Sequence, residues 1–146
     1  MSRENIETSR RGLEEAFNAG KLEVIDEISS DDFVGHDPLA GEQDTEAAKQ
    51  QVASYREAFP DIEITIEEIF AAGDKVVMRW SGNGTFKNPL MGMQPTGEKG
   101  APVHGITIDR FDDDGKIAES WTQWDTMTFM RNIGAMPEGA AAGAGS

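Results

Sequence analysis

The chain has 146 residues, near the usual size of one domain and enough to bury a single core. Its 27 acidic and 13 basic side chains give a net charge of −14, which argues against nucleic-acid or anionic membrane partners, because both require clustered Lys and Arg. Without cysteine it has no disulfides, thiolate metal sites or cysteine nucleophiles. No apolar run approaches the roughly 20 residues that span a bilayer, and no apolar stretch typical of a secretory signal follows the charged N-terminus. We therefore expect a soluble, cytoplasmic protein.

The acidic excess has two interpretations. A carboxylate-rich surface keeps a protein soluble, and it is also typical of proteins from a salt-rich cytosol, where ions screen the self-repulsion. Composition does not decide between them, so a halophilic source is a hypothesis.

Apolar residues at helical spacing predict three N-terminal helices, over residues 6–19, 22–28 and 45–59. Gly20 is a natural stop for the first helix, Asp44 can cap the third, and Pro60 ends it. Between the second and third helices, we expect a short extended segment that Pro38 ends. Its polar pair, His36 and Asp37, lies either in a polar turn or at the mouth of a pocket.

After Pro60 the hydrophobic pattern changes to the period of two that is typical of half-buried strands. Strands are predicted over residues 62–67, 75–85, 103–111 and 116–125. Turn formers between them indicate two hairpins, while the Pro- and Gly-rich residues 86–102 indicate a long loop at the rim of a pocket. One or two helical turns are predicted over residues 126–133.

This order of elements predicts an α+β fold in which three helices pack on a curved, mainly antiparallel sheet. Such a sheet leaves a pocket on its concave face. We expect residues 1–135 to form one domain and the Gly/Ala-rich residues 136–146 to be a disordered tail.

His104 shares a strand face with Ile106 and Ile108, so its imidazole is expected to point into an apolar layer. A core histidine held by a backbone carbonyl is the structural alternative. With only two histidines, 68 positions apart in sequence, no metal-ligand pattern is recognisable, and we expect a metal-free site.

Glu119, Trp121 and Asp125 share one face of the last predicted strand if no bulge intervenes. Apolar surroundings keep a carboxylate basic, and a neighbouring imidazole can share its proton, which would suit acid–base chemistry. The alternatives are a solvated or ion-paired Glu119 and an Asp125 that caps the final helix. The three tryptophans, Trp80, Trp121 and Trp124, would suit a flat, largely hydrocarbon ligand held by stacking.

Several motifs in the second half of the chain resemble those of SnoaL-like polyketide cyclases, also called ester cyclases. They are Arg79–Thr85, Met91–Gly97, Gly105–Phe111, Asp114–Trp121 and the pair Trp124-Asp125. This family belongs to the nuclear transport factor 2-like superfamily, which also includes ketosteroid isomerase. The resemblance implies a cone-shaped fold with a deep pocket, a homodimer formed through the sheet, and no metal or organic cofactor.

The resemblance also implies a reaction, ring closure of a small polyketide-like or aromatic ester by intramolecular aldol condensation. A carboxylate transfers the protons with help from a pocket histidine, and these roles carry over to Asp125 and His104. The residues expected to bind the substrate are His36, Tyr55, Trp80, Met91, Glu119 and Trp121. Two alternatives stay open, an epoxide-hydrolase-like or dehydratase-like enzyme of the same fold and a non-catalytic protein that binds small molecules.

Overall fold

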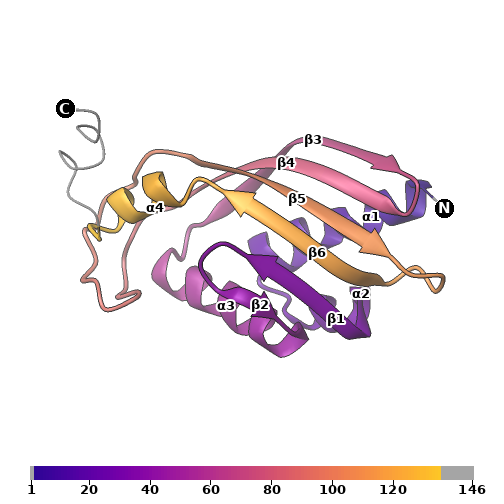
Figure 1. Ribbon diagram of the computed structural model, residues 1–146. Helices are drawn as coiled ribbons and strands as arrows, with labels where there is room; N and C mark the ends of the chain where they lie inside the picture. Colours follow the sequence, from indigo (N-terminus) through magenta and orange to yellow (C-terminus); the bar gives the residue numbers. More distant parts are fainter. Residues whose placement is uncertain (1, 136–146) are drawn as a thin grey trace.

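The computed structural model describes residues 2–135 and shows a six-stranded sheet with three N-terminal helical segments behind it (Figure 1). In chain order the elements are α1 (Ser2–Arg11), the π-helix η1 (Gly12–Asn18), α2 (Glu23–Ile28), β1 (Ser29–Asp37), β2 (Gly41–Gln43), α3 (Thr45–Ala58), β3 (Glu63–Ala72), β4 (Lys75–Asn83), β5 (Val103–Phe111), β6 (Ile117–Trp124) and α4 (Thr126–Asn132). The predicted α+β fold is confirmed. The predicted tail, residues 136–146, lies outside the described residues.

The sheet is mixed, with strand order β2-β1-β6-β5-β4-β3. Only the pairing of β1 with β6 is parallel, and it places His36 beside Trp121. Strand β1 begins at Ser29, earlier than its turn-rich sequence indicates, because it is held by β6 rather than by its own propensity. Strand β2 was not predicted, since three residues are too few to show a period.

The N-terminal helix starts at Ser2 and widens into η1, whose π-type hydrogen bonds include the one from the Ala19 amide to the Glu14 carbonyl (3.1 Å). It ends next to Gly20, whose φ of 76° favours glycine. The third helix begins as predicted, because the Asp44 carboxylate accepts a hydrogen bond from the Ala47 amide (2.8 Å).

The apolar core has two parts. One lies between the N-terminal helices and the sheet, where Val24 and Ile28 pack with Val76 and Met78. The other lies at the opposite end of the molecule and is built on aromatic residues from α3, the loop of residues 84–102 and α4; its buried members are Ala58, Phe59, Phe86, Phe129 and Ile133. The cavity described below is lined by residues that pack against one part, such as Phe17 and Trp80, and by residues that pack against the other, such as Tyr55 and Trp124.

Gly105 explains which face of the sheet turns toward the helices. Its partner on β4 is Trp80 and its partner on β6 is Trp124. A Cβ atom at position 105 would collide with the Trp80 ring and with the Cβ of Trp124. A glycine is therefore required where the two indoles lie on the inner face, and the other residues of β5 follow by alternation.

We predict that Gly105→Ala lowers the free energy of unfolding by about 1–3 kcal/mol, the usual cost of overpacking. Two of the three atoms that collide belong to the six-membered ring of the Trp80 indole, which Trp80→Phe removes, while the Cβ of Trp124 remains. The double variant should therefore lose less stability than the sum of the two single variants in chemical denaturation. Strictly additive losses would contradict this explanation.

Candidate functional site

A cavity of about 250 Å³ lies between the inner face of the sheet and the helices. Its walls are mainly apolar and come from both helices and strands; the aromatic rings that line it are Phe17, Phe33, Tyr55, Phe59, Trp80, Trp124 and Phe129. Several of these rings pack edge to face, for example Tyr55 on Phe129 with centroids 5.6 Å apart. Such walls suit a flat, mostly apolar ligand.

Asp37 is the only carboxylate among the described residues that line this cavity. One carboxylate oxygen, Oδ1, accepts a hydrogen bond from Trp124 Nε1 (3.0 Å). The other, Oδ2, accepts from the amides of Leu39 and Ala40 (2.9 Å each) in the turn that Pro38 begins. All three partners are N–H donors, so they satisfy an ionised carboxylate and fix its orientation.

Tyr55 on α3 lies near this carboxylate. Burial, with the negative charge of Asp37 as a second cause, raises the pKa of Tyr55 to about 12, although its hydrogen bond with Gln51 acts in the opposite direction. The side chain is therefore a neutral phenol at physiological pH. It can donate a hydrogen bond to a ligand but does not serve as a base.

Hydroxyl groups line the part of the sheet that forms the floor of the cavity. Trp80 Nε1 donates a hydrogen bond to Thr107 Oγ1 (3.0 Å), which lies 3.0 Å from Thr122 Oγ1. Ser120 also lines the cavity, and its hydroxyl donates to Oδ1 of Asp109 (2.8 Å).

Asp109 itself is almost inaccessible, with 5% of its surface exposed. Its second oxygen accepts a hydrogen bond from Ser9 of α1 (2.8 Å), so the carboxyl group ties this helix to the sheet. Burial raises the pKa of Asp109, and the hydrogen bonds from Ser120 and Ser9 only partly oppose the shift.

The structure places the two predicted catalytic residues outside this cavity. His104 is exposed on the outer face with Ile106, so the expectation that its imidazole points into an apolar layer is wrong. Alternation along a strand shows which residues share a face, but it does not show which of the two faces the helices cover. Asp125 is exposed and caps α4, where its carboxylate accepts hydrogen bonds from the amide (3.1 Å) and hydroxyl (2.6 Å) of Thr128. These bonds lower its pKa.

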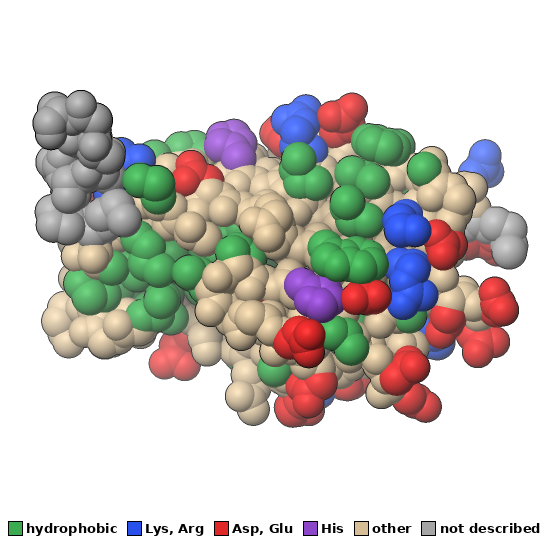
Figure 2. Space-filling model, viewed as in Figure 1, with side chains coloured by type: hydrophobic (Ala, Val, Ile, Leu, Met, Phe, Trp, Pro, Cys, Tyr) green, Lys and Arg blue, Asp and Glu red, His purple; other side chains and the backbone are tan. Residues whose placement is uncertain are grey.

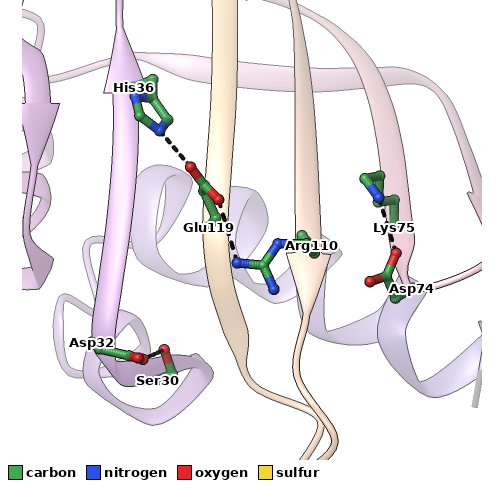
Figure 3. Close-up of polar contacts among 7 residues, drawn as sticks. All are labelled: Ser30, Asp32, His36, Asp74, Lys75, Arg110 and Glu119. Carbon is green, nitrogen blue, oxygen red and sulfur yellow. Dashed lines mark hydrogen bonds and ion pairs between the residues drawn. The ribbon is translucent and has the colours of Figure 1, made fainter.

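Three of the predicted binding residues meet on the outer face of the sheet rather than in the cavity. His36 borders the cavity, but its imidazole stacks on Trp121 (centroids 5.8 Å apart) and its Nε2 lies 2.7 Å from Oε2 of Glu119. Figure 3 shows this contact continuing to Arg110, whose Nη2 lies 3.3 Å from Oε1 of Glu119. The hydrogen bond with His36 is the largest cause that lowers the pKa of Glu119. Glu119 is therefore in an ion-paired setting, which is the alternative that the sequence left open beside an acid–base role.

The other predicted binding residues divide between the cavity and the surface. Tyr55 and Trp80 line the cavity, and their role in binding stays a prediction. Met91 lies in the loop of residues 84–102, where it is 55% exposed and does not line the cavity.

Sequence reasoning named Asp37 only as half of a polar pair in a turn or at the mouth of a pocket, and it did not select Thr107 or Thr122, although the signal was present. Alternation from Phe33 puts Asp37 on the face opposite His36, and alternation from Gly105 puts Thr107 inside. Thr122 follows because it pairs with Thr107 across the β5–β6 ladder. The histidine and carboxylate side chains that fit an acid–base pattern lie on the other face of the sheet.

Among residues 2–135, no helix is long and apolar enough to cross a membrane. In the same part of the chain, no three His, Asp or Glu side chains are grouped so that they could hold a metal ion.

Comparison with known proteins identifies the family to which the chain belongs. Residues 7–133 match the family described as SnoaL-like polyketide cyclase. No curated protein matches the chain significantly.

Many solved structures share the fold. AclR from Streptomyces galilaeus, provisionally described as a hydroxylase, is 25% identical with a TM-score of 0.82, over 94% of this chain and 89% of that one. A protein from Jannaschia sp. CCS1, provisionally described as a SnoaL-like polyketide cyclase, is 27% identical with a TM-score of 0.82, over 93% of this chain and 95% of that one. IdmH from Streptomyces antibioticus, provisionally described as a polyketide cyclase, is 29% identical with a TM-score of 0.75, over 89% of this chain and 98% of that one.

The buried carboxyl group of Asp109 predicts a specific dependence of stability on pH. Because its pKa is raised in the folded state, the folded protein binds more protons than the unfolded chain above pH 4. This group therefore lowers the free energy of unfolding as pH rises from its unfolded pKa through its folded pKa. We expect Asp109→Asn to gain stability relative to the wild type across that window in urea denaturation. Parallel pH curves for the two proteins would contradict this expectation.

Proposed function

Because the chain belongs to the SnoaL-like polyketide cyclase family, we propose that it closes a ring in a small polyketide-like or aromatic ester by acid–base catalysis without a cofactor. The observation that carries the proposal is a carboxylate, Asp37, held in a fixed orientation at the wall of a mainly apolar cavity that seven aromatic residues help to line. We assign it the role of the base that the sequence assigned to Asp125.

The reaction follows from what such a carboxylate can do. Asp37 removes a proton from an acidic C–H group next to a carbonyl, and the electron pair moves onto the carbonyl oxygen as an enolate. The enolate carbon then attacks a second carbonyl in the same molecule, forming a C–C bond and an alkoxide. The alkoxide takes a proton, and the proton on Asp37 balances this step, so the product is an isomer of the substrate.

The surroundings of Asp37 support this role. Its three N–H partners fix the direction of the carboxylate, while the mainly apolar walls limit the access of water to the proton transfer. A carboxylate is a weak base, so it suits an acidic C–H that lies beside a carbonyl and an aromatic ring.

The lining also favours an uncharged substrate. Among the described residues that line the cavity there is no Lys or Arg, and the carboxylate of Asp37 would repel an anion. A volume of about 250 Å³ limits the ligand to a small molecule. A neutral aromatic ester or ketone therefore fits better than a free acid.

We expect Asp37→Asn to slow proton abstraction by about 10²- to 10⁴-fold, because the amide keeps the shape and removes the base. The measurement is exchange of the benzylic hydrogens of 2-tetralone, a small aromatic ketone, in deuterated water by NMR. Asp125→Asn is the matched control, since it removes an exposed carboxylate that caps α4 and should cost about 1 kcal/mol of stability with little effect on exchange.

Each outcome of this comparison has a meaning. If Asp125→Asn or His104→Phe abolishes exchange while Asp37→Asn does not, the assignment from family resemblance is right and ours is wrong. If the wild-type protein does not accelerate exchange or ring closure of any neutral keto ester, the non-catalytic binding alternative is favoured.

The outer face of the sheet supports a homodimer. Hydrophobic side chains gather over the middle of this face, with charged groups beside them (Figure 2). Ile106 and Phe70 are 46% and 48% exposed there. Ion pairs between Arg79 and Glu68 (3.1 Å) and between Arg110 and Glu119 offer both charges to a second copy related by a two-fold axis. Trp124 lies on the inner face and does not contribute to this surface.

We predict that Ile106→Glu shifts the protein from dimer to monomer in light scattering, because each interface would bury two uncompensated carboxylates. The cavity lies on the other face of the sheet, so 2-tetralone exchange should be retained by the monomer. A wild-type protein that is monomeric at micromolar concentration would contradict the proposed dimer.

A further inference from the structure

Three hydrogen-bonding side chains form a line across the floor of the cavity. They come from three adjacent strands, with Trp80 on β4, Thr107 on β5 and Thr122 on β6. Trp80 Nε1 lies 3.0 Å from Thr107 Oγ1, and Thr107 Oγ1 lies 3.0 Å from Thr122 Oγ1. All three residues line the cavity.

The chemistry of these groups determines which group donates and which accepts each hydrogen bond. An indole N–H only donates, so Thr107 Oγ1 must accept from Trp80. Thr107 is 9% exposed, and its own O–H group therefore needs an acceptor. Thr122 Oγ1 is the only other side-chain partner that the described residues give it. Thr107 thus donates to Thr122.

This arrangement leaves the Thr122 hydrogen free of a partner within residues 2–135. Thr122 is half-buried at the cavity floor, so this O–H group is available to a ligand. Accepting a hydrogen bond from Thr107 polarises the Thr122 hydroxyl and makes it a better donor.

The position of Thr122 is complementary to that of Asp37. Thr122 lies two residues before Trp124 on the same face of β6, which is roughly 7 Å along the strand. The Trp124 indole in turn holds Asp37. The parallel register that pairs His36 with Trp121 brings the next residues, Asp37 and Thr122, to neighbouring positions on the inner face of adjacent strands. A ligand at this part of the cavity therefore meets an acceptor and a donor together.

We propose that the Thr122 hydroxyl donates the hydrogen bond that holds the reacting carbonyl oxygen of the substrate, with Thr107 and Trp80 as positioning residues that fix its direction. The role of that oxygen rests on the proposed function, because enolisation develops negative charge there. Thr122 would then stabilise the enolate while Asp37 holds the proton.

Binding can test the contact without any turnover. The probes are acetophenone, whose carbonyl only accepts hydrogen bonds, and α-methylstyrene, which has the same shape without the oxygen. The wild-type protein should bind acetophenone about three- to tenfold more tightly. Thr122→Val should remove this preference, and Thr122→Ser should keep it. Thr65→Val, the same replacement at an exposed position of β3 that does not line the cavity, is the matched control and should leave the preference intact. Tyr55→Phe removes another hydroxyl of the cavity and tests whether that group holds the carbonyl instead.

An infrared spectrum of bound acetophenone provides the second measurement. A hydrogen bond lowers the carbonyl stretching frequency, so the frequency should rise in Thr122→Val and return in Thr122→Ser. Thr107→Val and Trp80→Phe should give intermediate shifts, because they leave the hydroxyl in place but remove what directs it. A change in cavity packing alone would not follow this order.

The proposal is overturned if Thr122→Val keeps the preference and frequency of the wild type, if Tyr55→Phe abolishes them instead, or if the wild type does not prefer acetophenone. Failure of the proposed function has a different signature, since exchange of 2-tetralone would be absent while the carbonyl contact remains. If both hold, Thr122→Val should also reduce the rate constant kcat for exchange by about 10²-fold, with a smaller change in KM.

Discussion

The close approach of two tryptophans over Gly105 is the constraint on which the cavity depends. Trp80 and Trp124 flank this glycine on adjacent strands, and neither could lie there if position 105 carried a side chain. The same placement brings one indole N–H group to Thr107 and the other to Asp37. A packing requirement of the sheet therefore also orders the polar groups of the site, which explains how a mostly apolar cavity keeps a fixed acceptor and a fixed hydroxyl.

The two faces of the sheet differ in the charged and polar groups that they carry. The outer face carries complete ion pairs and both histidines, with His36 and Arg110 sharing the carboxylate of Glu119. The inner face carries hydroxyls and one carboxylate that lines the cavity, each with an identified partner among the described residues. Because unpaired charges are costly in an apolar cavity, this separation leaves Asp37 as the single carboxylate among the described residues that line it.

The order and type of most elements could be predicted from the sequence, because periods of 3.6 and 2 are local properties. The strand over Val103–Phe111 was predicted with its observed bounds, and so was the role of Asp44 as a helix cap. The site could not be predicted in the same way. Whether His104 faces the cavity depends on which side of β5 the helices cover, and this is decided by Gly105 and its two tryptophan neighbours on other strands. Strand β2 and the parallel pairing of β1 also depend on partners distant in sequence.

The buried carboxyl of Asp109 shows how the helices are held over this floor. Burying an acid is unfavourable, yet its two oxygens satisfy Ser9 on α1 and Ser120 on β6, so replacing it by an apolar group would leave two buried or half-buried hydroxyls without that partner. The unfavourable free energy of burying Asp109 is therefore coupled to the position of α1, because the helix can move away from the sheet only if Ser9 loses its acceptor. Since Ser120 lines the cavity, the group that anchors the helix also orients one hydroxyl of the floor. The depth of the cavity and the direction of its polar groups are thus determined together, by contacts that join the first helix to the last strand.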